Sequence, residues 1–150
     1  MKLLEFKKEL LNACFDEIDD RVASLRKVMD EAQQSANDYG QPKDRYDSYR
    51  AQLLRKRDLF GQQLYKILEQ RNILEKVNAE KTSDIVEFGA VVVTNMQKIF
   101  ISVGLGKIEC RGGDYFVISP GVPIFKAMEG MKAGDSFEFR GQKINILEIS

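Results

Sequence analysis

The sequence contains no histidine and no tryptophan, and it has only two cysteines and three prolines. Cys14 and Cys110 lie far apart and belong to no CxxC motif, so the sequence predicts neither a zinc site nor a disulfide framework. We expect two free thiols in a reducing compartment. Charged residues interrupt the leucines at the amino terminus, which is not the pattern of a signal peptide or a membrane span. We therefore expect a cytoplasmic protein.

The sequence also has no excess of charge of either sign, because 23 basic residues balance 23 acidic ones. No net field is therefore expected to attract the chain to nucleic acid or to an anionic membrane. With 150 residues, 43% of them hydrophobic and 31% charged, the composition is that of one globular domain or two small ones. Partners have to be inferred from local features.

The first half carries apolar residues with a period of seven. One such row precedes the segment NDYGQPKDRYDSY at 37–49, and a second row follows it. The rows are Leu4, Leu11, Ile18, Leu25 and Ala32, and then Tyr46, Leu53, Phe60, Ile67 and Leu74. This period is typical of a coiled coil, and a short connection forces the two helices to lie antiparallel. We predict a helical hairpin over residues 1–78, with its tip at 37–49.

The pattern changes at residues 78–84, where polar residues replace the heptads, and we predict a second domain over 84–150. Five short runs there are rich in β-branched and aromatic residues and are separated by glycine-containing turns. These runs are EFGAVVVTN, KIFISVG, DYFVIS, DSFEF and KINILEI. Between the third and the fourth, Pro123 suits a first helical turn, and Gly130 or Gly134 suits the exit. The expected fold class is α+β, a coiled-coil hairpin followed by an antiparallel sheet with one short helix.

The string ISPGVPIFKAMEGMKAGDSFEF, followed by KINILEI, resembles the carboxy-terminal region of the bacterial Gre transcript-cleavage factors, GreA and GreB. The matching positions are Ile118, Ser119, Pro123, Ile124, Ala127, Gly130, Gly134 and Asp135. EFGAVVV at 87–93 is similar to the first strand of that domain in the family. The resemblance covers nearly the whole chain, because the family also joins an amino-terminal antiparallel coiled coil to an FKBP-like domain.

The resemblance implies an accessory factor of RNA polymerase that is not itself an enzyme. The FKBP-like domain of such factors docks at the secondary channel, and the tip of the coiled coil reaches the polymerase active site. There, tip acids help to hold a magnesium ion, so that the polymerase hydrolyses backtracked RNA. The implied partners are RNA polymerase and the nascent RNA and DNA of the elongation complex. No cofactor is expected on the isolated chain, which we expect to be a monomer.

Aligning the family's tip glycine with Gly40 places Gln41 where the family has its first acid, Asp44 at the second and Asp47 at the third. Magnesium favours carboxylate oxygens, so Gln41 weakens the expected site. Asp44 is the implied magnesium ligand, shared with the polymerase, and Asp47 could pair with it across one helical turn. Aspartates after Gly40 and Pro42 are also favoured by the amino terminus of a helix without any function.

Other candidate residues lie outside the tip acids. Tyr39 could contact RNA or polymerase. The basic cluster of Arg55, Lys56 and Arg57 could reach phosphates in the channel, although a solvated flank of the coiled coil has the same pattern. The family's Ser-Pro dipeptide corresponds to Val122 and Pro123, and the candidate docking loop is Ser119, Pro120, Gly121, Val122 and Pro123. These residues could also simply turn the chain into the helix.

Three alternatives remain open at this point. The first is a Gre-fold regulator that binds the polymerase without promoting cleavage. The second is an FKBP-like peptidyl-prolyl isomerase or chaperone, which predicts an aromatic-lined pocket. The third is a structural adaptor whose helices dimerise, which predicts exposed apolar residues on the outer faces.

Overall fold

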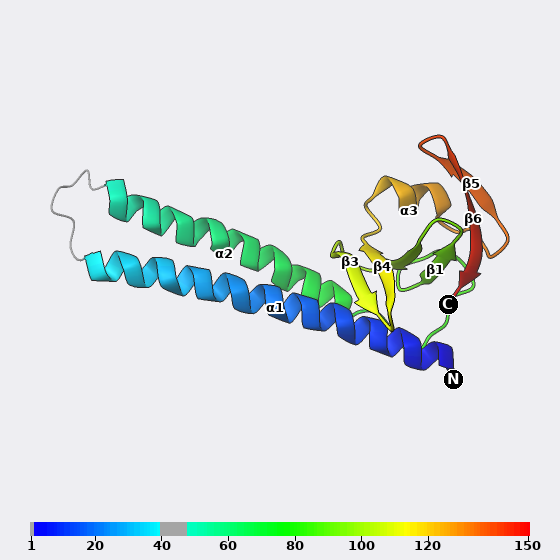
Figure 1. Ribbon diagram of the computed structural model, residues 1–150, viewed down its shortest axis with the longest axis horizontal. Coiled ribbons are helices and arrows are strands. Elements are labelled where there is room, and N and C mark those ends of the chain that lie inside the picture. Colours follow the sequence, from blue (N-terminus) through cyan, green and yellow to red (C-terminus); the bar gives the residue numbers. More distant parts are fainter. Residues whose placement is uncertain (1, 40–47) are drawn as a thin grey trace. The chain divides into compact units, whose positions relative to one another are not determined.

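The computed structural model describes residues 2–39 and 48–150, with side chains from residue 5 onward. Contacts divide the chain into two compact units (Figure 1). One unit comprises Met1–Glu17 and Asn72–Ser150, and the other comprises Ile18–Arg71. We call them the sheet unit and the helical unit. The predicted domain boundaries at residues 78 and 84 stay a prediction.

Two long helices, α1 (Lys2–Tyr39) and α2 (Ser48–Leu74), pack side by side in the helical unit. Paired residues rise in number along α1 as they fall along α2, so the helices are antiparallel. The pairs are Asp19 with Arg71, Met29 with Gly61, Gln33 with Arg57, and Tyr39 with Tyr49. The predicted antiparallel arrangement of two long helices is confirmed.

The core of the helical unit is thin, because a pair of helices can bury only one stripe of each partner. Ile18 and Ala32 of the first heptad row are fully or almost fully buried. Leu53, Phe60 and Ile67 of the second row are half-buried. The members of the predicted rows within the described part of the helical unit are therefore buried or half-buried, and Tyr46 lies outside the described residues.

The first turns of α1 belong to the sheet unit and bury a different stripe. Lys7, Leu10 and Cys14 are buried, whereas Leu11 of the predicted row is only half-buried. Successive spacings of three and four residues keep this stripe on one face of the helix. The face lies against the sheet, since the rings of Phe6 and Tyr115 have their centroids 5.2 Å apart.

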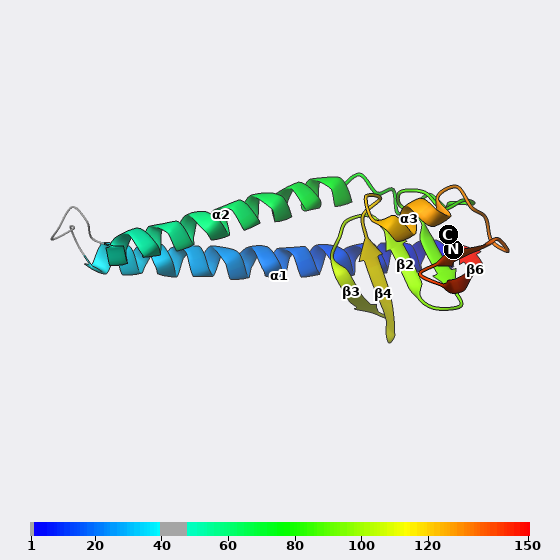
Figure 2. The same cartoon turned by 90° about the horizontal axis from the view of Figure 1, so that it is seen from above.

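Six strands form one sheet, in the order β3-β4-β2-β1-β6-β5 (Figures 1 and 2). The strands are β1 (Val91–Thr94), β2 (Lys98–Ile101), β3 (Gly106–Cys110), β4 (Gly113–Ile118), β5 (Ser136–Phe139) and β6 (Gln142–Ile149). The prediction of five antiparallel strands was wrong in two details. It missed β3, and β4 pairs with β2 in parallel. The chain passes through β3 at the edge before β4 returns beside β2, so β2 and β4 run in the same direction.

The short helix α3 (Pro123–Met128) begins at Pro123 as predicted, with the proline in the first turn. Its Phe125 and Met128 are buried in the core of the sheet unit, which also contains Val92, Ile99 and Ile146. Gly130 follows the helix with φ of +78°, a conformation that glycine adopts without strain. The α+β fold class is therefore confirmed.

Candidate functional site

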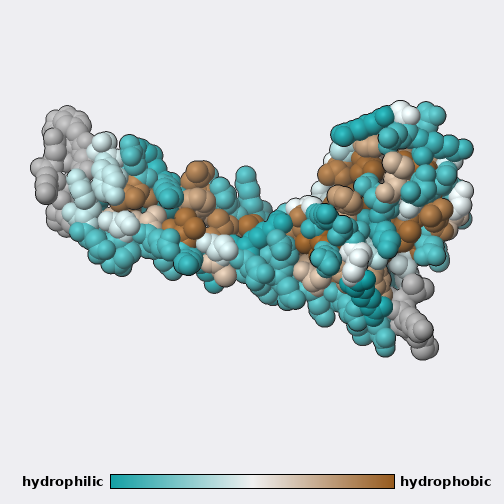
Figure 3. Space-filling model, in the orientation of Figure 1, coloured by the Kyte–Doolittle hydropathy of each residue, from teal (hydrophilic) through white to brown (hydrophobic). Residues whose placement is uncertain are grey.

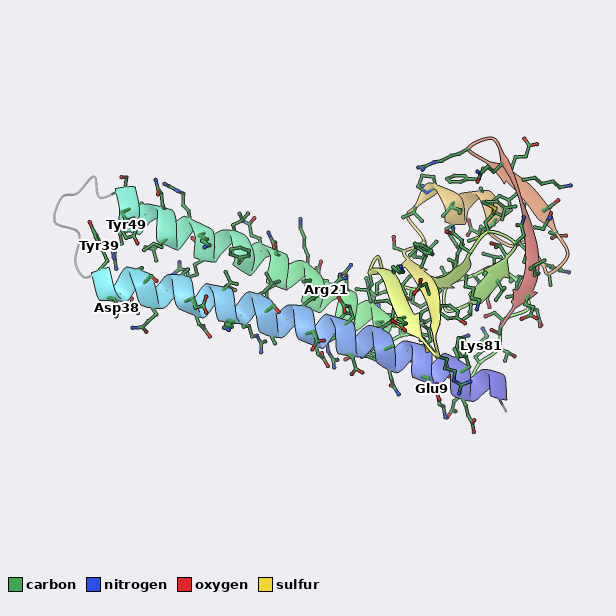
Figure 4. The ribbon with its side chains drawn as sticks, viewed as in Figure 1. Glu9, Arg21, Asp38, Tyr39, Tyr49 and Lys81 are labelled. Atoms are coloured by element: carbon green, nitrogen blue, oxygen red, sulfur yellow. The ribbon has the colours of Figure 1, made fainter. Side chains whose placement is uncertain are left out.

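Two tyrosines contact each other where α1 ends and α2 begins (Figure 4). The rings of Tyr39 and Tyr49 meet edge to face, with centroids 5.0 Å apart and an interplanar angle of 61°. This geometry is a favourable one for aromatic pairs. Tyr39, predicted to contact RNA or polymerase, is still 39% exposed and Tyr49 is 52% exposed. The pair holds the ends of α1 and α2 together while leaving part of each ring accessible.

The predicted tip acids lie between these two tyrosines in the chain. Gln41, Asp44 and Asp47 lie outside the described residues, so their roles stay predictions. The nearest described acid is Asp38, whose Oδ1 accepts a hydrogen bond of 2.8 Å from Gln34 Nε2. Asp38 is exposed at the end of α1, and it provides a reference acid beside the predicted tip.

The predicted basic cluster divides into two kinds of side chain. Arg55 and Lys56 are exposed on α2. Arg57 donates to Gln33 Oε1 on α1, and its Nε and Nη2 donate to Asp58 Oδ1 at 3.0 and 2.7 Å. Arg57 therefore links the two helices, whereas Arg55 and Lys56 present their charge to solvent.

A hollow of about 600 Å³ lies next to Arg57 in the helical unit. It forms where Gly61 places no side chain opposite Met29, whose Cε lies 3.5 Å from the Cβ that another residue would have. Tyr65, which also lines the hollow, is 65% exposed, and Leu59 of α2 is 55% exposed. Figure 3 shows apolar surface along this unit. Sequence reasoning missed the hollow, and Gly61 within the heptad pattern was the signal for it.

The candidate docking loop connects β4 to α3. Val122 has an extended backbone, with φ of −83° and ψ of 150°, and Pro123 begins the helix. The Val122 N–H donates to the Ser119 carbonyl at 3.4 Å. Val122 also packs against the core, whereas Gly121 and Pro123 are exposed. Val122 therefore fixes the loop to the core, while Gly121 and Pro123 stay accessible to solvent. The loop belongs to the sheet unit, whereas Tyr39 and the basic cluster belong to the helical unit.

A buried lysine is the main feature that sequence reasoning missed. Lys7 is only 2% exposed, and its Nζ donates to the carbonyl oxygens of Lys81 at 2.8 Å and Ser150 at 3.4 Å. Burial lowers the pKa of Lys7, while Glu87 opposes this shift and Lys81 adds to it. The spacing of Lys7, Leu10 and Cys14 on one helical face was the only sequence signal.

The two cysteines are free thiols in the sheet unit. Cys14 is fully buried, and burial raises its pKa to about 12, with a smaller effect from Cys110. Burial also raises the pKa of the half-buried Cys110. Both thiols are therefore held in the protonated form, which is the less reactive one.

Residues 2–39 and 48–150 contain neither a metal-binding cluster nor a membrane-spanning helix. Within these residues, no cluster of three or more acids or cysteines is arranged to hold a metal ion. Nor does any helix in the described part of the chain have the length and apolar character needed to span a membrane.

A scan against protein-family models and a search of curated proteins find no match. Among solved structures, the chain is similar to the transcription factor Gfh1, with 15% identity, a TM-score of 0.36, and coverage of 90% of this chain and 92% of that chain. It is also similar to the crystal structure of GreA factor homolog 1 (Gfh1) of Thermus thermophilus, with 15% identity and a TM-score of 0.34 over 91% of this chain and 94% of that chain. The chain is thus similar, over most of its length, to proteins named as a transcription factor and as a GreA homologue.

Proposed function

We propose that this protein is a Gre-type accessory factor of RNA polymerase that modulates elongation or rescues backtracked complexes. The observation that carries the proposal is the antiparallel pair of α1 and α2, whose ends are joined by the Tyr39–Tyr49 contact. The acid-containing segment 40–47 connects these ends in the chain. A rigid pair of helices is a suitable carrier for a short segment that has to enter a narrow channel. The Gre-like motif from Ile118 to Asp135 supports the same reading.

The sheet unit would supply the docking surface in this proposal. The loop Ser119 to Pro123 is a suitable candidate, because Val122 fixes it to the core while Gly121 and Pro123 stay exposed. A loop held in one conformation before binding loses little entropy when a partner covers it. RNA polymerase would therefore meet a preformed surface at its secondary channel.

The helical unit would supply the channel contacts. Tyr39 offers part of an aromatic ring, and Arg55 and Lys56 offer exposed positive charge. Phosphate contacts require only positive charge within reach, so these lysine and arginine side chains suit the RNA of a backtracked complex. Arg57 instead links the two helices by donating to Gln33 of α1, and it also donates to Asp58 on its own helix.

The chemistry in this proposal belongs to the polymerase. Asp44 would lend a carboxylate to a magnesium ion that the polymerase also binds, and Asp47 would assist it. Because Gln41 replaces the first of the family's three tip acids, cleavage stimulation should be weaker than with all three acids. The alternative is a regulator that occupies the channel without stimulating cleavage, and the rate of RNA cleavage distinguishes the two.

The test is RNA cleavage in stalled, backtracked complexes of the cognate polymerase. Four samples are compared: no factor, the wild-type protein, Asp44→Asn and Asp38→Asn. Asp38→Asn is the matched control, because it removes one exposed acid at the end of α1 that accepts a hydrogen bond from Gln34. Faster cleavage with the wild type and with Asp38→Asn, but not with Asp44→Asn, is the result expected for a factor that lends a metal ligand.

Two other outcomes would argue against a factor that stimulates cleavage. If no variant speeds cleavage but all compete with a cleavage-competent factor for the complex, the protein is a regulator that occupies the channel. If it neither stimulates cleavage nor competes, the proposal is overturned. In that case a proline-isomerisation assay on a model peptide addresses the FKBP-like alternative.

A further inference from the structure

A small polar cavity in the sheet unit is not needed for the function proposed above. It has a volume of about 220 Å³. One side is formed by Lys7 of α1, and the rest by the segment from Lys76 to Gly89, which leads from α2 into the sheet. The side chain of Lys81, labelled in Figure 4, belongs to this segment.

The charge of the cavity has one sign. The ionisable side chains that line it, among the residues described, are Lys7, Lys76 and Lys81. Two acids are nearby but do not line it. Glu87 lies 3.8 Å from the Lys81 ammonium, and Glu80 lies 3.4 Å from Lys8. The Lys81–Glu87 contact is long and Lys81 is exposed, so it neutralises this lysine only weakly. Glu80 pairs with Lys8, which does not line the cavity.

The other polar groups of the cavity are suited to donate hydrogen bonds. The Asn78 side-chain oxygen already accepts the Glu80 N–H at 3.0 Å, which leaves the two N–H groups of its amide for another partner. Ser83 is almost fully buried and contributes a hydroxyl. Lysine ammonium groups, an amide and a hydroxyl together form a site rich in donors.

Lys7 is the group least explained by packing alone. A buried ammonium is unfavourable unless it is well paired, and an ammonium has three N–H donors. Two of them point to the carbonyl oxygens of Lys81 and Ser150. The Lys81 carbonyl is a neutral acceptor, and burial lowers the pKa of Lys7, while Glu87 opposes this shift. An anion in the cavity would accept the third hydrogen and compensate the charge.

We propose that this cavity binds a compact phosphate-type oxyanion through Lys7, Lys76 and Lys81, with further donors from Asn78 and Ser83. Tetrahedral oxyanions accept several charge-assisted hydrogen bonds at once. The volume exceeds the roughly 10–15 Å³ needed for one water, yet it is smaller than the roughly 300 Å³ at which pockets for drug-sized ligands begin. A phosphate ion or a single phosphate group therefore fits the space.

The carboxyl end of a helix also favours lysine without any ligand. This effect can account for Lys76, which follows the end of α2 at Leu74. It does not account for the burial of Lys7, which lies on another helix. Binding of an anion explains all three lysines together, and a titration distinguishes the two explanations.

The experiment is a titration followed by the amide signals of the ¹⁵N-labelled full chain. Inorganic phosphate is added at constant pH and constant ionic strength, with sodium chloride as the balancing salt. Adenosine monophosphate, titrated in the same way, distinguishes a free ion from a phosphate group carried by a nucleotide. The test variant is the double substitution Lys76→Gln with Lys81→Gln. The control variant is Lys126→Gln with Lys143→Gln, which removes two exposed lysines of the same unit.

The expected result is a saturable shift of the amides between Lys76 and Gly89 in the wild type and in the control variant. The double substitution in the cavity should weaken binding by about tenfold, because two charges near the anion are lost. The amide spectrum of each variant without ligand shows whether it is folded. Shifts that never saturate with either probe, or an equal dissociation constant in the cavity variant, would overturn the proposal. This outcome is independent of any result with RNA polymerase.

Discussion

Replacing Lys7 by methionine and, separately, by alanine separates two contributions of its side chain to stability. The stem is buried, since the residue is only 2% exposed, and the ammonium donates to the Lys81 carbonyl at 2.8 Å. Methionine keeps an unbranched stem of similar length but has no charge. Alanine removes the stem beyond Cβ as well as the charge. The difference between the two variants therefore reports the packing of the stem.

The expected magnitudes follow from these contacts. Both variants leave the Lys81 carbonyl without its donor, which costs about 1 kcal/mol, and both remove a buried charge, which offsets part of that cost. Lys7→Met should therefore stay within about 1 kcal/mol of the wild type. Lys7→Ala also loses three buried methylenes at about 0.8 kcal/mol each, so it should be destabilised by about 3 kcal/mol.

The pH dependence has a definite sign. Burial holds the pKa of Lys7 below its usual 10.5 in the folded chain, so the unfolded chain binds the proton more tightly. The stability contributed by Lys7 therefore rises as the pH increases from the lowered folded pKa towards 10.5. Below the folded pKa the penalty for burying the charge is constant. The wild type should gain stability relative to Lys7→Met within this window.

The assay is urea unfolding followed by circular dichroism, with midpoints and slopes compared between variants. Lys8→Ala is the matched control. Its side chain is 54% exposed and its ammonium lies 3.4 Å from Glu80, so its loss should change stability by less than about 0.5 kcal/mol. Equal destabilisation by Lys7→Met and Lys7→Ala would refute the role of the stem. If the difference in the free energy of unfolding between the wild type and Lys7→Met does not change with pH, the role of the buried charge is refuted.

Three further predictions concern other positions. Gly61→Ala should stabilise the helical unit by about 0.5–1 kcal/mol, because the new Cβ would meet Met29 Cε at an ordinary 3.5 Å; a lower urea midpoint would contradict this. Gly89→Ala should cost about 1–2 kcal/mol through backbone strain, since Gly89 has φ of +88°, and a thermal unfolding midpoint equal to that of the wild type would argue against strain. Iodoacetamide should modify Cys110 before Cys14, because Cys14 is fully buried with a pKa of about 12. Peptide mass mapping reports the order of labelling, and early modification of Cys14 in the absence of urea would contradict the prediction.

Some of the architecture could be predicted because it depends on short stretches of chain. Two apolar rows of the same period, separated by a short segment, can bury their stripes against each other only as an antiparallel pair. Pro123 could be placed at the start of α3 for an equally local reason, since proline lacks the N–H that the first turn does not use. In contrast, β3 was missed because only Ile108 of its five residues is buried, and one β-branched residue without an aromatic one is too weak a signal for a strand.

The candidate site was predictable only in part. The loop from Ser119 to Pro123 could be located from its motif, and the structure gives its geometry. That Arg57 is bound to Gln33, whereas Arg55 stays exposed, depends on the rotation of α2 against α1. A run of adjacent basic residues does not contain that information.

The sequence by itself determined the two long helices, the change of pattern after residue 78 and the α+β class. These follow from the periods of apolar residues and from the backbone preferences of proline and glycine, which act within one or two turns. The tertiary structure alone decided that β4 runs parallel to β2, and that the ammonium of Lys7 meets the carbonyl of Lys81 across 74 residues of sequence. Such pairings form when surfaces that are distant in the sequence are buried together, because the free energy gained by burial depends on which surfaces contact each other.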